Sequence, residues 1–142
     1  MGDFALLGGS LERGAFKRRL YMLCRQRGKV TLLFFSPSLS CGGHVEHLTA
    51  YAGWCSAHPQ RSAWTLWAIS PESLPLHEAT ARVHGLTAPL LTDADCAAAK
   101  LFGLADEGGY TPAVFLIGPD RTLLWKSLSP GREPPVALGP LV

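Results

Sequence analysis

Cys41 stands between an apolar run and a segment with helical periodicity, where a thiol can become reactive. The run Val30–Phe35 reads VTLLFF, a length typical of one buried strand, and a cluster of breakers separates it from Cys41. Apolar residues then recur at helical spacing from Val45 onward. A helix beginning here would turn its unsatisfied N–H groups and positive dipole end toward the thiol, which lowers the thiol pKa. We therefore predict that Cys41 is a nucleophile, against the alternative of a small residue filling a turn.

Polar neighbours of Cys41 could assist it. His44 could hydrogen-bond or charge-pair with the thiolate, as in Cys–His pairs, or it could be a solvent-facing histidine of the first helical turn. Ser38 and Ser40 could donate hydrogen bonds to the thiolate, or they could serve only the local turn. We carry His44 and Ser38 forward as candidate catalytic residues beside Cys41.

A metal site is a minor alternative at the same place. Cys41, His44 and His47 form a Cys-x-x-His-x-x-His pattern, and thiolate with imidazole suits zinc or copper. A fourth ligand is not evident, although His58 or Cys96 could approach. We therefore expect no metal and no other cofactor.

The other three cysteines have separate predictions. The spacings of the four cysteines match no small disulfide framework. Cys24 lies on an apolar helical face, and Cys55 would lie about 20 Å from Cys41 along a continuous helix. Both are expected in the core. Cys96 is a candidate resolving thiol.

Helices and strands alternate along the chain, which is the pattern of an α/β fold. The predicted strands are 3–7, 30–35, 64–69, 89–91, 113–117 and 122–127. The predicted helices are 11–26, 44–58, the segment from the turn at 70–73 to residue 84, and 96–102. Strands joined by helices pair in parallel, and the closing hairpin adds an antiparallel edge, so the sheet is expected to be mixed. Cys41 follows the carboxyl end of a strand, where sites in such sheets lie.

Composition limits the classes of protein and partner. With 142 residues, 47% of them apolar, the chain is expected to be one domain, 1–142. Its parts are an N-terminal extension with a helix (1–29), a core (30–128) and an irregular tail (129–142). The net charge of +2, without basic runs interleaved with aromatics, argues against nucleic acid. The basic cluster Lys17-Arg18-Arg19 is a solvated helix face or a contact for an anionic surface.

Membrane insertion and secretion are not expected. The sequence has no apolar stretch of about 18 residues that could span a bilayer. Its first residues lack the charged region of a secretory signal, so we expect a cytoplasmic protein.

Several segments resemble the thioredoxin-like superfamily, and within it the peroxiredoxins, the alkyl hydroperoxide reductase and thiol-specific antioxidant proteins. They are VTLLFFSPSLSC, WAISPES, GLTAPLLTDADCAAAKLFGL and YTPAVFLIGPDRTLLW, which follow the family order across about residues 30–128. The resemblance implies a thioredoxin-like three-layer α/β/α sandwich with a mixed central sheet. It also implies a reductase of small-molecule peroxides or protein disulfides, regenerated by an external thiol, and it allows a homodimer.

The motif residues differ from those of either branch. Thioredoxins carry Cys-x-x-Cys, but the tetrapeptide from Cys41 reads CGGH. Peroxiredoxins carry Pro-x-x-x-Thr-x-x-Cys; Ser38 takes the place of the Thr, but Pro37 lies four residues before Cys41 rather than seven. Pro112 stands near the place of the peroxiredoxin arginine. Thr111-Pro112 resembles the thioredoxin cis-proline instead, which predicts a cis bond beside the cysteine. The competing interpretation is a non-catalytic thioredoxin-fold module for binding or dimerisation.

Overall fold

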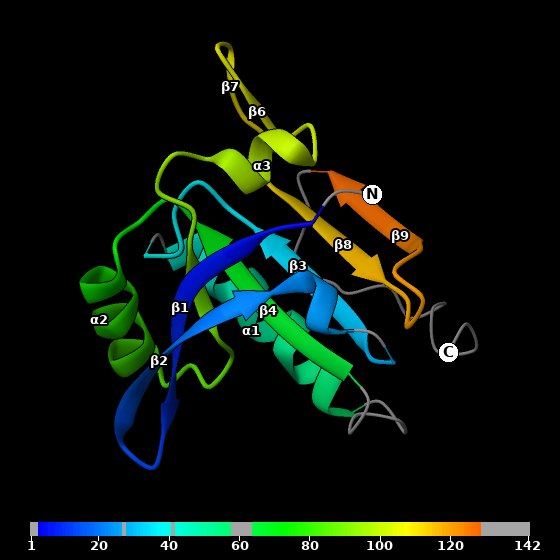
Figure 1. Ribbon diagram of the computed structural model, residues 1–142. Helices are drawn as coiled ribbons and strands as arrows, with labels where there is room; N and C mark the ends of the chain where they lie inside the picture. Colours follow the sequence, from blue (N-terminus) through cyan, green and yellow to red (C-terminus); the bar gives the residue numbers. More distant parts are fainter. Residues whose placement is uncertain (1–2, 27, 41, 58–63, 129–142) are drawn as a thin grey trace.

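The computed structural model describes residues 3–26, 28–40, 42–57 and 64–128, with the backbone alone for 42–44, 56–57 and 128 (Figure 1). Within these ranges, seven strands form one sheet in the order β2-β1-β5-β4-β3-β8-β9. Their bounds are β1 Ala5–Glu12, β2 Ala15–Met22, β3 Val30–Phe35, β4 Trp64–Ser70, β5 Leu90–Thr92, β8 Ala113–Ile117 and β9 Leu123–Leu128. The three central strands β3, β4 and β5 are parallel, and the outer pairings are antiparallel. The predicted mixed sheet is confirmed.

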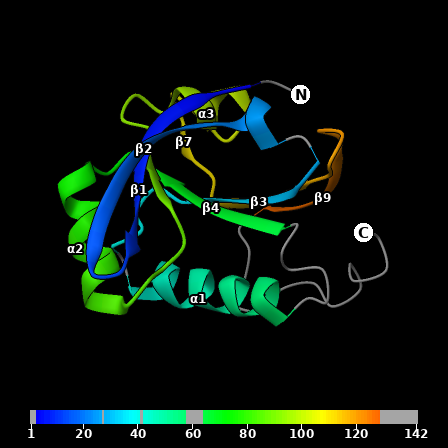
Figure 2. The same ribbon diagram turned by 60° about the horizontal axis from the view of Figure 1, so that its bottom comes forward.

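Helices cover both faces of this sheet. They are α1 Gly42–Ala57, α2 Leu74–His84 and α3 Ala97–Leu101, with a 3-10 helix at Leu23–Gln26. The short strands β6 (Ala105–Asp106) and β7 (Gly109–Tyr110) form a separate hairpin. Figure 2 shows α1 and α2 on one face of the sheet and α3 on the other. The α/β/α sandwich predicted from the sequence is confirmed.

The central strands bury both of their faces, which explains their continuous apolar sequences. Along β3, Leu32 and Phe34 join the core cluster beneath α1 and α2, whereas Leu33 and Phe35 join the cluster beneath α3. β4 and β8 alternate between the two clusters in the same way. Such doubly buried strands give no polar alternation, only an apolar run.

The predicted turn at 70–73 leads into α2, and polar and special residues fix both ends of this helix. Ser73 caps the amino end, where its hydroxyl accepts a 3.4 Å hydrogen bond from the Leu76 amide. Pro75 lies in the first turn, where a missing N–H costs nothing, and Gly85 ends the helix at φ +64°. Most other predicted elements are also present, with slightly shifted ends. They are the helices after Cys41 and Asp95 and the strands 30–35, 64–69, 89–91, 113–117 and 122–127.

The predicted helix 11–26 is wrong. These residues form most of a hairpin, in which β1 and β2 pair antiparallel across a loop of Arg13 and Gly14. Both loop residues have positive φ, +53° and +83°, as in the type I′ turn that matches strand twist. The spacing was ambiguous because residues four apart, such as Phe16 and Leu20, share a face in a helix and in a strand.

The N-terminal residues are therefore part of the sheet rather than an extension carrying a helix. β1 pairs with β5 through Gly8 and Gly9, and added side chains at these positions would strike Leu90 or Phe16. The predicted irregular tail, 129–142, lies outside the described residues. No described helix is long and apolar enough to cross a membrane.

Candidate active site

The segment before Cys41 leaves the carboxyl edge of the sheet. β3 ends at Phe35, a loop of residues 36–40 follows, and α1 begins at Gly42, directly after Cys41. Cys41 itself lies outside the described residues. The first turn of α1 contains no acidic residue, so the positive end of the helix dipole is not offset there. The predicted arrangement of strand, turn, cysteine and helix start is thus present in the chain on both sides of Cys41.

The loop is fixed from within by Ser36 and Leu39. The buried Ser36 hydroxyl donates to the Ser38 carbonyl at 2.8 Å and accepts from the Ser38 amide at 3.2 Å. Leu39 is fully buried in the cluster beneath α1. Ser40, next to Cys41, is exposed. Because Leu39 is buried in the core, it holds the next residue, Ser40, at the surface.

Glu72 fixes the same loop from the end of β4. Its Oε1 accepts hydrogen bonds from the amides of Leu39 at 2.7 Å and Ser40 at 3.1 Å. Its Oε2 accepts from the hydroxyls of Ser38 at 3.0 Å and Ser40 at 2.6 Å. Glu72 is not among the residues predicted from the sequence, because it lies more than thirty residues from Ser38 and Leu39 in the chain. Only the parallel pairing of β3 and β4, which places their carboxyl ends together, could have suggested it.

These hydrogen bonds outweigh the effect of burial on the carboxylate. Burial alone would raise the pKa of Glu72. The donors of Ser40, Leu39 and Ser38 favour the charged form and leave the pKa of Glu72 below its ordinary value. Glu72 is therefore an anion at neutral pH.

Ser38 lies in loop 36–40, and its role beside Cys41 stays a prediction. Its hydroxyl lies 3.0 Å from Glu72 Oε2 and 3.2 Å from Ser40 Oγ. A hydroxyl carries a single hydrogen, so while Ser38 donates to Glu72 it can offer other groups only lone pairs. The backbone of His44 lies in the first turn of α1, and its side chain is outside the described part of the structure.

Thr111 and Pro112 lie beside the loop, but the predicted cis bond is wrong. Ala113 pairs with Phe35, so the residues just before β8 enter the sheet next to those just after β3. No peptide bond among the described residues is cis, and the Thr111–Pro112 bond is therefore trans. The Thr111 amide donates to the Leu104 carbonyl at 2.7 Å, which ties this segment to the end of α3. Pro112 thus directly precedes β8 through an ordinary trans bond.

The sequence model of the AhpC/TSA family matches residues 4–126. The chain belongs to the AhpC/TSA family. The match includes the hairpin of β1 and β2 as well as the segments that carry the resemblance in the sequence. No curated protein sequence matches this AhpC/TSA chain.

Solved structures share the fold of this AhpC/TSA protein. Mycobacterium tuberculosis AhpC is 17% identical at a TM-score of 0.76, over 93% of this chain and 83% of that chain. A mutant of Xanthomonas campestris peroxiredoxin Q is 21% identical at a TM-score of 0.68, over 87% of this chain and 80% of that chain. Enterococcus faecalis AhpC is 24% identical at a TM-score of 0.67, over 90% of this chain and 77% of that chain. Family and fold together establish a thiol-based, peroxiredoxin-like function, and a non-catalytic binding module is not favoured.

In this AhpC/TSA chain, Cys96 follows the carboxyl end of β5, just as loop 36–40 follows that of β3. Cys96 packs on the face of the sheet that α3 covers, opposite the face covered by α1. It precedes α3 with φ +59° and contacts the cluster beneath α3, whereas α1 covers the other face. Burial raises its pKa, and Asp93 adds to the effect. β5, the strand before Cys96, is separated from β3 by β4, a span of about 10 Å between strand axes. Its role as a resolving thiol stays a prediction.

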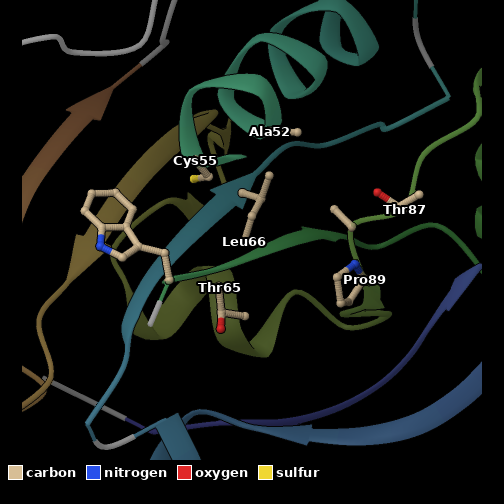
Figure 3. Close-up of a pocket in the computed structure, with 8 residues that line it drawn as sticks. Ala52, Cys55, Thr65, Leu66, Thr87 and Pro89 are labelled. Carbon is tan, nitrogen blue, oxygen red and sulfur yellow. The ribbon is translucent and has the colours of Figure 1, made fainter. Parts of the chain in front are cut away.

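Cys55 is a core residue, as predicted. It lines a pocket of about 340 Å³ between α1, the amino end of β4 and the segment before β5 (Figure 3). Burial raises its pKa to about 12, so the thiol is neutral and unreactive at ordinary pH. The pocket lies toward the amino ends of the parallel strands, away from the edge that leads to Cys41. Cys24, predicted to be buried in a helix, is only half-buried in the 3-10 helix.

The predicted metal alternative draws no support from the described side chains. Among them, no group of three or more His, Cys, Asp or Glu residues is arranged to hold a metal ion. Two of the proposed ligands, Cys41 and the His44 side chain, lie outside that set.

Proposed function

We propose that this protein reduces a peroxide or a disulfide through the thiolate of Cys41. The observation that carries the proposal is that α1 begins at the residue after Cys41, at the carboxyl end of β3, in a chain of the AhpC/TSA family. A helix start favours the thiolate, which is the attacking form. His44 is proposed as its hydrogen-bonding or charge-pairing partner.

With a peroxide, the Cys41 sulfur attacks the terminal oxygen of the O–O bond. That bond breaks, Cys41 becomes a sulfenic acid, and the remaining oxygen leaves as an alkoxide or hydroxide that takes a proton from water. An external thiol then condenses with the sulfenic acid, releasing water and leaving a mixed disulfide. A second thiolate attacks the mixed disulfide and restores the Cys41 thiolate. With a disulfide as substrate, the first attack gives the mixed disulfide directly.

The surroundings of the loop support an organic substrate. A shallow pocket of about 580 Å³ is lined by Pro71 and Ser73, which flank Glu72, and by apolar side chains that include Leu7 and Leu74. Glu72 lies between the lining residues Pro71 and Ser73 in the chain, and it accepts a hydrogen bond from Ser40, the neighbour of Cys41. An apolar group attached to a peroxide or disulfide would lose water-exposed surface there.

The test is to trap Cys41 after a short exposure to hydrogen peroxide and to cumene hydroperoxide. Peptide mass spectrometry with a sulfenic-acid reagent should find the adduct on Cys41. Cys41→Ser should abolish peroxide consumption with a small dithiol as reductant, while Cys24→Ser should consume peroxide at the wild-type rate. Equal consumption by Cys41→Ser and wild type would overturn the proposal.

The pocket can be tested with Leu7→Asp, because Leu7 is 57% exposed and its replacement should not disturb the core. We expect Leu7→Asp to slow the reaction with cumene hydroperoxide and to leave that with hydrogen peroxide unchanged. Equal slowing of both would count against a role for the pocket.

A homodimer is also proposed, and sedimentation equilibrium of the reduced protein would decide it.

A further inference from the structure

We infer that Glu72 is a positioning residue for Cys41, because it holds the segment that precedes Cys41 in one conformation. The inference rests on the proposed function only for its effect on reactivity. The position of the segment itself can be measured without any reaction.

The carboxylate accepts hydrogen bonds from Ser38 and Ser70, and three more from the consecutive residues Leu39 and Ser40. Both hydrogen-bonding groups of Ser40, its amide and its hydroxyl, donate to Glu72, and they reach different oxygens, at 3.1 and 2.6 Å. The Leu39 amide donates to the same oxygen as the Ser40 amide, at 2.7 Å. Two successive peptide planes are thus oriented by one carboxylate, and the next residue in the chain is Cys41. Hydrogen bonds to a charged acceptor are stronger than neutral ones, so this orientation is well determined.

Glu72 is itself held by the ends of the two neighbouring strands. Its amide donates to the Ser70 hydroxyl at 3.0 Å, and its carbonyl accepts from the Thr92 hydroxyl at 3.0 Å. Ser70 is fully buried at the end of β4, and Thr92 ends β5. Loop 36–40 is therefore tied through Glu72 to β4 and β5 as well as to β3. A residue fixed by rigid strands can transmit their geometry to a surface loop.

Two other roles for Glu72 predict different outcomes. If Glu72 acted mainly through its negative charge, it would oppose ionisation of a nearby thiol, and its neutral replacement would speed every reaction of Cys41. If it served only general stability, its replacement would slow every reaction and lower the melting temperature. A positioning residue affects the reaction that demands a defined approach and spares a reaction that does not.

The experiment compares Glu72→Gln with wild type, using Glu78→Gln as the matched control. Glu78 lies on α2 and is paired with Arg82 rather than with loop 36–40. For Glu72→Gln, we expect the rate constant of Cys41 with peroxide to fall by about 10- to 100-fold, because a small misplacement of a reacting group costs that much. The rate constant for alkylation of Cys41 by iodoacetamide should stay within about threefold of the wild-type value, since the rate with a small alkylating agent depends mainly on the thiolate fraction. Glu72→Asp, which keeps the charge, should recover part of the peroxide rate.

Amide hydrogen exchange supplies the readout that does not depend on reactivity. Leu39 and Ser40 should exchange about tenfold faster or more in Glu72→Gln, while amides in the middle of β3 and the melting temperature stay near wild type. Unchanged exchange at Leu39 and Ser40 would overturn the inference. So would a peroxide rate within twofold of wild type, or parallel changes in the peroxide and alkylation rates.

The two proposals fail separately. If wild-type Cys41 does not react with peroxide or disulfide, the proposed function fails, and hydrogen exchange still decides whether Glu72 holds the loop. If wild type reacts but Glu72→Gln reacts equally fast, the inference fails and the proposed function stands.

Discussion

The Ser40 hydroxyl donates a 2.6 Å hydrogen bond to Glu72 Oε2, which joins the residue before the proposed nucleophile to the end of the neighbouring strand. Ser40 makes the largest of the contributions that lower the pKa of Glu72, against the opposing effect of burial. The chain segment that leads into α1 is thereby linked to a charged group just after β4 rather than only to its own turn.

Removing this hydroxyl should raise the pKa of Glu72 toward its ordinary value. In Ser40→Ala the carboxylate keeps the Leu39 and Ser40 amides but loses one donor that favours its charged form. The measurement is a carbon NMR titration of the Glu72 carboxyl group in both proteins. Ser73→Ala is the matched control, because Ser73 caps α2 and bonds the Leu76 amide instead. A Glu72 pKa that is the same in Ser40→Ala and wild type would contradict the assigned contact.

Stability should decrease as pH falls below neutrality, and His77 should contribute. His77 is fully buried, and burial lowers its pKa despite the opposing effects of the Leu91 carbonyl, Glu72 and the Ser70 carbonyl. Because the folded pKa lies below the unfolded value, the unfolded chain binds a proton first on acidification. The stabilising contribution is complete above the unfolded pKa, about 6.5, and is lost as pH falls through the folded pKa.

Urea denaturation between pH 8 and 5 would measure this loss. The slope due to His77 can reach about 1.4 kcal/mol per pH unit. His77→Gln should flatten the curve, whereas His84→Gln replaces an exposed histidine of the same helix and serves as control. Glu72 adds a further loss of stability at lower pH, since its pKa in the folded protein is also lowered. Equal slopes in His77→Gln and wild type would show that His77 does not carry the effect.

Two glycines should respond oppositely to alanine. Gly14 has φ +83° in the hairpin loop, so Gly14→Ala forces a side chain into a left-handed conformation and should destabilise the fold by about 1 kcal/mol. Gly53 lies inside α1, and an added Cβ there would meet no described atom within 4 Å. Gly53→Ala should therefore stabilise by about 0.5–1 kcal/mol. Urea denaturation at neutral pH measures both, and a stabilising Gly14→Ala would contradict the hairpin.

The cysteines should differ in their reaction with iodoacetamide in the native protein. Cys55 should stay unmodified at pH 8, because it is buried and its pKa is raised to about 12. Cys96 is partly exposed, but its pKa is also raised, so it should react slowly. Cys41 is expected to react first. Peptide mass spectrometry at several times, with a guanidinium-unfolded control in which all sites react, gives the order; early modification of Cys55 would contradict its burial.

The central part of the fold could be predicted because its strands are buried on both faces. Runs such as Val30–Phe35 and Trp64–Ser70 admit few other structures when breakers bound them. The N-terminal hairpin could not be recognised from apolar spacing, since Phe16 and Leu20 fit two periods. The informative residue was Gly14, which permits the positive φ of a hairpin loop.

The site was only partly predictable for a different reason. The helix start after Cys41 and the turn at Ser38 are local features, and both are visible in the sequence. The contact of Glu72 with loop 36–40 depends on which strands are neighbours, which no local pattern contains. The cis bond at Pro112 was inferred from resemblance to thioredoxins rather than from the residues, and this chain does not share it.

The edge position of β2 bears on self-association. In the described sheet β2 has one neighbour, so one side of its backbone is available to another strand. Lys17, Arg18 and Arg19 are exposed along it, and within the described residues only Arg19 among them forms an ion pair, with Glu12. Two copies joined edge to edge at this strand would bring like charges face to face, which opposes such pairing. The basic cluster thus opposes open-ended extension of the sheet through β2.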